Sequence, residues 1–236
     1  MNIEILRKAC SECSLQELCL PLGISAQDLE TLDGIVDTIG PLHRGEHLFR
    51  QGEIFQSLYS IRSGCVKSYA DSENGEEQVL GFHLPGELIG MDAIYRGAHQ
   101  CSAEILDTTL ICRLPFAELS DLARQLPSLQ RQLFRLMSQT LETSQILSSQ
   151  HSAEERLAAF LLDFGDRIQA RGFSSNHFIL PMSRQDIASY LRLVPETVSR
   201  ALNHLAGESL IEITRRDIRL KNRPELERRC PRDSRL

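Results

Sequence analysis

Three cysteines lie close together near the start of the chain, at Cys10, Cys13 and Cys19. Their spacing, two residues and then five, brings three thiols into a ten-residue segment that can wrap around a metal centre. Thiolates are soft ligands that hold iron–sulfur clusters and zinc. The spacing differs from both ferredoxin patterns, so the residues alone leave an iron–sulfur cluster and zinc open as alternatives.

The cellular compartment of the protein determines whether these thiols stay reduced. The first residues, Met1–Lys8, contain acidic Glu4 and no apolar run of signal-peptide type, and the longest apolar runs of the chain are too short to span a membrane. We therefore expect a cytoplasmic protein, in which seven cysteines stay reduced. Metal binding or redox sensing is then favoured over structural disulfides.

The other four cysteines are spread along the chain. Cys112 is followed closely by Pro115-Phe116, whereas Cys65, Cys101 and Cys230 have no surrounding motif. A single cysteine is most often a small buried apolar side chain. That is the default for Cys112 taken by itself. Cys65 and Cys101 are expected to pack in the roll, Cys230 lies in a basic tail, and none of these three is a candidate ligand.

A second constellation lies near the C-terminus. Residues 182–205 contain two short apolar helical patterns separated by the three residues Arg192-Leu193-Val194, which is typical of a helix-turn-helix. The apolar positions recur at helical spacing, at Ile187, Ala188 and Leu191 in the first helix and at Val198, Ala201, Leu202 and Leu205 in the second.

The opposite face of the second helix carries Glu196, Ser199 and Arg200, at i, i+3 and i+4. Arginine offers a bidentate fork to guanine, glutamate accepts from cytosine N4, and serine contacts several bases. One good bidentate contact contributes about 1–3 kcal/mol of discrimination, against about 0.2–0.5 kcal/mol for a surface Glu–Arg pair. With a short turn before it and a basic hairpin after it, this helix is predicted to recognise bases in the major groove of DNA.

The charges divide between the two halves. Residues 1–150 hold 11 Lys/Arg and 20 Asp/Glu, a balance of −9, and residues 151–236 hold 15 and 12, a balance of +3. An acidic regulatory half joined to a basic half that binds nucleic acid has this distribution.

Patterns of hydrophobicity predict the elements that position these residues. Ser25 is expected to cap a helix at 27–39, and residues 41–115 alternate in short runs between glycines, which favours an antiparallel β-roll of jelly-roll type. A long helix is expected at 127–150. Its apolar stripe requires a partner, either the same helix of a second subunit or the roll itself.

Further helices are expected at 153–170 and 184–191, with another opened by Pro195. A hairpin follows at 210–221, and everything after Asn222 is expected to be frayed. The expected organisation is a cysteine-rich segment, a sensory β-roll, a dimerisation helix and a winged helix-turn-helix, over residues 1–24, 25–125, 126–150 and 151–236. The fold class is α+β.

These motifs resemble the Crp/Fnr superfamily of transcription regulators along almost the whole chain. Residues 47–53, 57–64 and 81–90 are similar to its sensory roll, and Glu196-Thr-Val-Ser-Arg200 matches the E-x-x-S-R pattern with which FNR-type members (fumarate and nitrate reduction regulators) recognise a TTGAT half-site. Two positions depart from the family. Arg192 replaces the usual turn glycine, and Val194 replaces a capping Ser or Thr.

The resemblance distinguishes between members of the superfamily. Members that bind cyclic nucleotides need an Arg-Ser or Arg-Thr pair after the Gly-Glu-Leu turn, and residues 99–104 contain no arginine, so cyclic AMP is not expected. FNR-type members carry the N-terminal cysteines plus one before a Pro-Phe pair. The resemblance therefore implies a 4Fe–4S cluster held by Cys10, Cys13, Cys19 and Cys112.

The same resemblance implies partners. We expect a homodimer on a palindromic site of double-stranded DNA, contact with RNA polymerase through the acidic loop 71–77, and no membrane. The implied function is an oxygen-responsive regulator of genes for anaerobic metabolism that dimerises when it holds the cluster.

Two other classes of protein stay open. One is a regulator of the same fold that senses nitric oxide, haem ligands or a metabolite, with the cysteines as bystanders. The other is an iron–sulfur or zinc redox enzyme. The sequence contains no G-x-x-x-x-G-K-[ST], H-E-x-x-H or G-x-S-x-G motif, so no enzymatic activity is expected.

Overall fold

The computed structural model describes residues 10–71, 75, 77–146 and 152–230. The chain forms two compact units, and the main division falls within a long helix, between Gln139 and Thr140. Within the described ranges, no helix is both long and apolar enough to cross a membrane.

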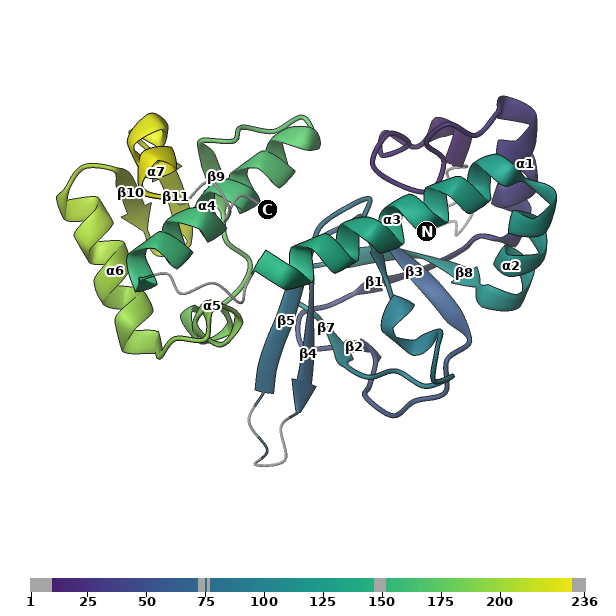
Figure 1. Cartoon of the computed structure of the whole chain (residues 1–236), viewed down its shortest axis with the longest axis horizontal. Helices are drawn as coiled ribbons and strands as arrows, with labels where there is room; N and C mark the ends of the chain where they lie inside the picture. The colour runs from purple at the N-terminus through teal and green to yellow at the C-terminus, as the bar shows by residue number, and fades with distance from the viewer. Residues whose placement is uncertain (1–9, 72–74, 76, 147–151, 231–236) are drawn as a thin grey trace. The chain divides into compact units, whose positions relative to one another are not determined.

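The first unit contains the expected antiparallel β-roll, made of two four-stranded sheets (Figure 1). The strand order is β1-β8-β3-β6 in one sheet and β2-β7-β4-β5 in the other. The strands are β1 Asp37–Leu42, β2 His47–Phe49, β3 Ser57–Ser63, β4 Val66–Asp71, β5 Glu77–His83, β6 Leu88–Ile89, β7 Ser102–Ile105 and β8 Thr109–Pro115. The prediction of an α+β fold with a roll of this kind is confirmed.

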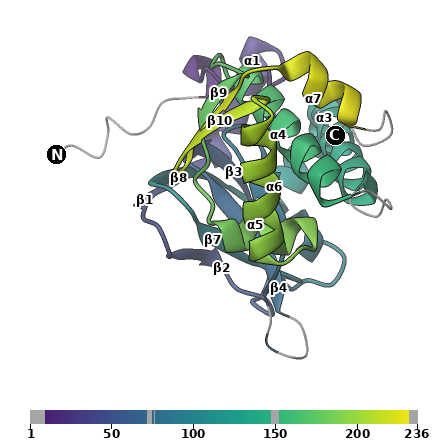
Figure 2. The same cartoon turned by 90° about the vertical axis from the view of Figure 1, so that its left-hand side faces the viewer.

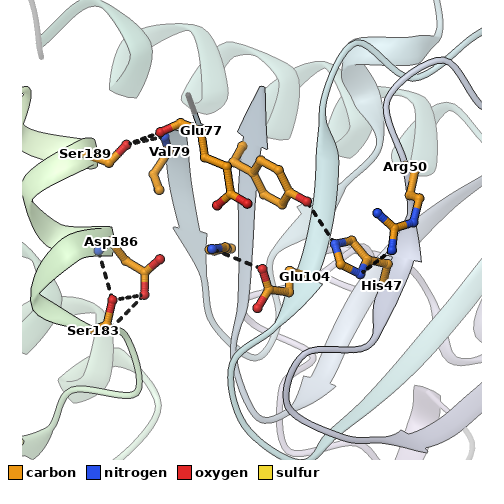
Figure 3. Close-up of polar contacts among 10 residues, drawn as sticks. His47, Arg50, Glu77, Val79, Glu104, Ser183, Asp186 and Ser189 are labelled. Atoms are coloured by element: carbon orange, nitrogen blue, oxygen red, sulfur yellow. Dashed lines mark hydrogen bonds and ion pairs between the residues drawn. The ribbon is translucent and has the colours of Figure 1, made fainter. Parts of the chain in front are cut away.

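In the β2-β7-β4-β5 sheet, alternation along the strands separates the apolar interior of the roll from a more polar outer face. The interior cluster includes Phe49, Val66, Ile105 and Ile111. On the outer face of the second sheet, Lys67 and Glu104 lie opposite each other in register, with Nζ and Oε2 3.0 Å apart (Figure 3). The His47 ring and the Tyr69 hydroxyl form a hydrogen bond of 2.9 Å on the same face.

A second apolar cluster joins the other sheet to three helices, α1 Ala26–Ile35, α2 Phe116–Gln125 and α3 Pro127–Ile146. In Figure 1 these helices lie together beside the purple N-terminal segment. Buried leucines from helices, strands and that segment make up the cluster, at positions 20, 29, 32, 58, 88, 114, 119, 122, 129 and 136. Short 3₁₀ turns at Cys10–Glu12 and Met91–Ala93 complete the unit.

One predicted helix is too long, and the end of another cannot be compared with its prediction. The helix expected at 27–39 ends at Ile35, because residues from Asp37 onward pair with β8 as strand β1. Sheet pairing with a distant segment therefore overrides the local helical period. The long helix begins at Pro127 as expected and is described to Ile146; positions 147–150 of the prediction lie outside the described residues.

The second unit is built around two packed helix pairs and a small sheet (Figure 2). Helix α6 packs against both α4 and α5, and the sheet has the strand order β10-β11-β9. Its elements are α4 Ala153–Ala170, β9 His177–Ile179, α5 Arg184–Leu191, α6 Pro195–Gly207, β10 Ile211–Thr214, β11 Asp217–Leu220 and α7 Arg223–Arg229.

Helix α7 contradicts the prediction of a frayed tail after Asn222. The Asn222 side chain caps this helix by accepting from the backbone N–H of Glu225, and Leu226 is fully buried. Arg223 forms an ion pair with Asp166 of α4 at 2.5 Å. One apolar side chain among many charged ones anchors the helix, and that tertiary contact has no periodic signal in the sequence. Residues 231–236 lie outside the described residues.

The helix-turn-helix forms where the sequence predicts it. Ser183 and Asp186 form a capping box at the start of α5: the Ser183 Oγ accepts from the Asp186 N–H at 3.0 Å, and the carboxylate accepts from the Ser183 N–H at 2.8 Å (Figure 3). Arg192 ends the helix with a φ of 55°, in the left-handed region that disfavours side chains with a Cβ. Val194 provides no side-chain cap for α6.

Replacement of Arg192 by glycine should stabilise the protein, because glycine adopts a positive φ without steric cost. We expect Arg192→Gly to exceed Arg192→Ala in free energy of unfolding by about 1 kcal/mol, measured by urea denaturation. Both variants lose the same charge, so their difference isolates the backbone term. Equal stabilities would show that this φ carries no strain.

The cysteine segment packs tightly on the roll at Gly86, whose φ is +92°. A Cβ at this position would lie 2.9 Å from the Leu18 Cβ, closer than real carbon contacts allow. Gly45 has a similar φ of +86° but open space around it. The two glycines therefore differ mainly in the steric contacts that an alanine methyl group would make at each position.

We expect Gly86→Ala to lose about 1–3 kcal/mol more free energy of unfolding than Gly45→Ala, because the methyl group pushes the cysteine segment off the roll. Urea denaturation of both variants under reducing conditions measures the difference. Similar losses in the two variants would mean that Leu18 does not pack against Gly86 in solution.

Candidate functional site

Cys112 lies in the middle of β8, between strands β1 and β3. Ile111 is fully buried in the interior of the roll, so Cys112, one residue further, belongs to the opposite face of the sheet. In register it lies opposite Ser60 on β3 and Thr38 on β1. The sheet thus holds this thiol rigidly on its outer side.

The other three cysteines belong to a segment of turns that precedes α1. Cys10 opens a 3₁₀ turn, and the Cys13 N–H donates to the Cys10 carbonyl at 3.2 Å. The Cys10 N–H donates to a carboxylate oxygen of Asp33 on α1. Cys19 contacts the sheet directly, with its Sγ 3.0 Å from the Ser60 Oγ. This contact brings the segment to the strand pair that carries Cys112.

All four cysteines line one pocket with about 430 Å³ of empty space, part of it open to solvent. Apolar residues form much of the remaining wall, at Leu15, Leu20, Pro21, Leu32, Val36, Ile61 and Leu114, together with the polar residues Gln16, Ser60 and Arg62. The structure therefore brings together Cys10, Cys13, Cys19 and Cys112. Their role as cluster ligands stays a prediction.

The remaining cysteines lie elsewhere. Cys65 and Cys101 are buried in the roll, and Cys230 is buried in the second unit, where its Sγ is 4.0 Å from the Glu155 carbonyl. All seven thiols are free of disulfides. Three cysteines are thus packed as small apolar side chains, away from the four that share the pocket.

Burial disfavours the ionised form of three of the pocket thiols, Cys10, Cys19 and Cys112. It raises the pKa of Cys112 to about 11, with a further contribution from the nearby Cys19 thiol, and it raises the pKa of Cys19 against the opposing effect of the Ser60 hydrogen bond. Burial and the Asp33 carboxylate raise the pKa of Cys10 well above its usual value. These three thiols therefore need an electrophilic partner, such as a metal, to lose their protons near neutral pH.

The pocket provides thiol donors, the set that holds iron–sulfur centres. Among the described residues, no three His, Cys, Asp or Glu side chains are arranged as ligands of a single metal ion.

Two polar residues at this site were not identified from the sequence. Ser60 contacts the Cys19 thiol, and Gln132 of α3 donates its Nε2 hydrogen to the Cys19 carbonyl at 2.9 Å. Ser60 lies in an ordinary alternating strand pattern. Gln132 does leave a trace in the sequence, because it is a polar residue within the apolar stripe of a long helix.

The predicted DNA-recognition residues lie on one exposed face of α6. Glu196, Ser199 and Arg200 are all exposed, while Val198 and Leu202 on the opposite side are buried. An Arg200 guanidinium N–H donates to the Thr197 Oγ1 at 3.3 Å, so the fork lies along the helix surface. Arg215 and Arg216 are also exposed, in the turn of the β10–β11 hairpin.

The raised pKa of Cys112 predicts slow alkylation in the metal-free protein. Only about one in a thousand of these thiols is ionised at pH 8, and the rate with iodoacetamide should rise about tenfold per pH unit until the pH approaches 11. The same cysteine in urea should level off near pH 9. Residue-specific mass spectrometry measures both, and a plateau below pH 9 in the folded protein would contradict the raised pKa.

Comparison with known proteins identifies both units. The cyclic nucleotide-binding domain family matches residues 40–125, and the Crp-like helix-turn-helix domain family matches residues 155–229. The transcriptional activator protein Anr of Pseudomonas protegens is 45% identical over 214 residues, 89% of this chain and 88% of that protein. The fumarate and nitrate reduction regulatory protein of Escherichia coli is 41% identical over 220 residues, 92% of this chain and 88% of that protein.

A solved structure agrees with these relatives. FixK2 from Bradyrhizobium japonicum superimposes with a TM-score of 0.74 at 28% identity, covering 83% of this chain and 96% of that one. The relatives are transcription regulators and not enzymes. The chain belongs to the Crp/Fnr family of transcription regulators, in the group that contains the FNR and Anr activators, and it is a DNA-binding protein.

Proposed function

We propose that this chain is an oxygen-responsive transcription regulator of anaerobic metabolism whose Cys10, Cys13, Cys19 and Cys112 hold a 4Fe–4S cluster. The observation that carries the proposal is the shared pocket: four of the seven cysteines, from two distant parts of the chain, line one cavity. Four cysteines are the usual ligand set of a 4Fe–4S cluster. The names of the relatives, which refer to anaerobic regulation and to fumarate and nitrate reduction, support the same assignment.

The four cysteines would differ in how firmly the fold holds them as ligands. Cys112 supplies a ligand fixed in the sheet, and the other three thiols supply ligands on a segment that folds against it. When bound, a cluster provides a centre that oxygen can attack. Because Cys112 is fixed in β8 and the other three thiols lie on a segment of turns, a change of order would begin in that segment.

The apolar face of α3 supports dimerisation. Phe134 is 62% exposed and Met137 is 39% exposed, one helical turn apart on a helix that buries other leucines in its own unit. We propose that the same helix of a second copy covers this face. A homodimer would then present two α6 helices to a palindrome of TTGAT type.

On DNA, Arg200 would donate to guanine, Glu196 would accept from cytosine, and Ser199 would make further base contacts. Arg215 and Arg216, with the net positive charge of residues 151–236, would contact phosphates and make binding sensitive to salt. The loop 71–77 is proposed to contact RNA polymerase; most of it lies outside the described residues. The protein is proposed to act in the cytoplasm, without cyclic AMP.

The interior of the roll supports the last point. The inward positions of β7 are Ala103 and Ile105, both fully buried in the apolar cluster. His99 stacks on Phe49 with ring centroids 3.7 Å apart, and burial lowers its pKa, which keeps the ring neutral. Among the described residues of this interior, the apolar side chains and the neutral imidazole provide no cation for a cyclic phosphate.

Protein purified without oxygen should be brown, carry about four irons per subunit and bind a TTGAT palindrome. Air should remove the colour, and DNA affinity should fall about 5–150-fold, as expected for coupled sites. Iron analysis, the visible spectrum and gel shifts measure these properties. Cys112→Ser should lose the iron, whereas Cys101→Ser, a control buried outside the pocket, should keep iron and DNA binding.

Three results would contradict parts of the proposal. Colourless protein that binds DNA equally well in air would eliminate the oxygen sensor and keep the transcription regulator. One zinc per subunit would replace the cluster. Equal loss of iron in both cysteine variants would show that the pocket does not select its ligands.

A further inference from the structure

A buried glutamine lies on the long helix where the cysteine segment meets it. Gln132 is 5% exposed, and its helical neighbours Leu129 and Leu136 are both buried in the apolar cluster of the first unit. Burial of a primary amide among leucines is costly unless its polar atoms are paired. The partners of Gln132 therefore explain why it is tolerated there.

Both ends of the amide are paired. The Gln132 Nε2 donates to the Cys19 carbonyl at 2.9 Å, and its Oε1 accepts from the Arg135 Nε at 3.0 Å. Because the guanidinium of Arg135 can only donate, the oxygen must face Arg135 and the NH₂ group must face Cys19. The orientation of the amide is thus determined by its surroundings.

The residue that Gln132 binds is also held on other sides. The Cys19 Sγ lies 3.0 Å from the Ser60 Oγ of β3, so its thiol is held at the sheet while its carbonyl is held by α3. Leu20 is 1% exposed and belongs to the same apolar cluster as Leu129. The Cys19–Leu20 pair therefore links the cysteine pocket to α3.

We propose that Gln132 is a positioning residue that couples the cysteine pocket to α3. If Cys19 leaves its place, the Gln132 amide loses its acceptor within an apolar face, and this loss disfavours the packed position of α3. By reciprocity, an α3 held in place keeps Cys19 in place. The inference rests on the proposed function only for the identity of the group that occupies the pocket.

The first test uses metal-free protein and the maleimide alkylation of Cys19, followed by mass spectrometry. Gln132→Met removes both hydrogen bonds. Gln132→Glu keeps an acceptor for Arg135 and removes the donation to Cys19. Both variants should raise the alkylation rate of Cys19 about fivefold, the effect of one hydrogen bond, without changing that of Cys101 in the roll.

The control is Gln130→Met, the same substitution at an exposed position of α3. It should alkylate like the parent protein. If Cys19 and Cys101 both react faster in the Gln132 variants, Gln132 has only a general structural role and the proposal is overturned. Unchanged rates in both Gln132 variants also overturn it. If Gln132→Met does not fold, Gln132→Glu carries the test.

The second test measures the coupling. Hydrogen exchange of the α3 amides at 128–138 is compared before and after anaerobic reconstitution with iron and sulfide. Loading should slow exchange in the parent and in Gln130→Met, and much less in the Gln132 variants at equal iron content. Equal slowing in all proteins overturns the inference. If the parent takes up no cluster, the proposed function fails, and the first test still decides the role of Gln132.

Discussion

Burial of the Cys19–Leu20 pair is the constraint on which the arrangement of the first unit depends. Leu20 is buried in the apolar cluster shared by α1, α2, α3 and the β1-β8-β3-β6 sheet. Cys19 contacts both β3 and α3. Turns leave many of their backbone N–H and C=O groups without a hydrogen bond inside the segment. Without this anchor, few contacts would therefore hold the cysteine segment on the roll. With it, three cysteines are brought to the strand that carries the fourth.

Local chemistry was enough to predict helices α4, α5 and α6 and the β10–β11 hairpin of the second unit. Ser183 and Pro195 mark the starts of two helices, and the structure places both starts where the residues predict them. These features depend on the residue itself and its near neighbours. Helix α7 could not be predicted in this way, because its stability depends on burial of Leu226 and on an ion pair with Asp166 of α4.

The first unit depended more on distant pairing. The expected helix at 27–39 was too long because β1 pairs with β8, a strand far along the chain. The spacing of Cys10, Cys13 and Cys19 is visible in the sequence, but only the family resemblance suggested Cys112. Ser60 reaches the site through its register opposite Cys112, and Gln132 reaches it through helix packing. Neither strand register nor helix packing produces a motif that can be recognised in the sequence.

Strand β8 separates two environments, and this has an evolutionary consequence. Ile111 faces the interior of a roll that matches the cyclic nucleotide-binding domain, while Cys112, the next residue, faces the cysteine pocket. Because successive side chains of a strand belong to opposite faces, substitutions on one face leave the other nearly untouched. Changes in the apolar interior therefore leave the cysteine pocket in place, and changes in the pocket leave the packing of the interior in place. One strand thus allows the two faces of the roll to change by separate, individually tolerated mutations.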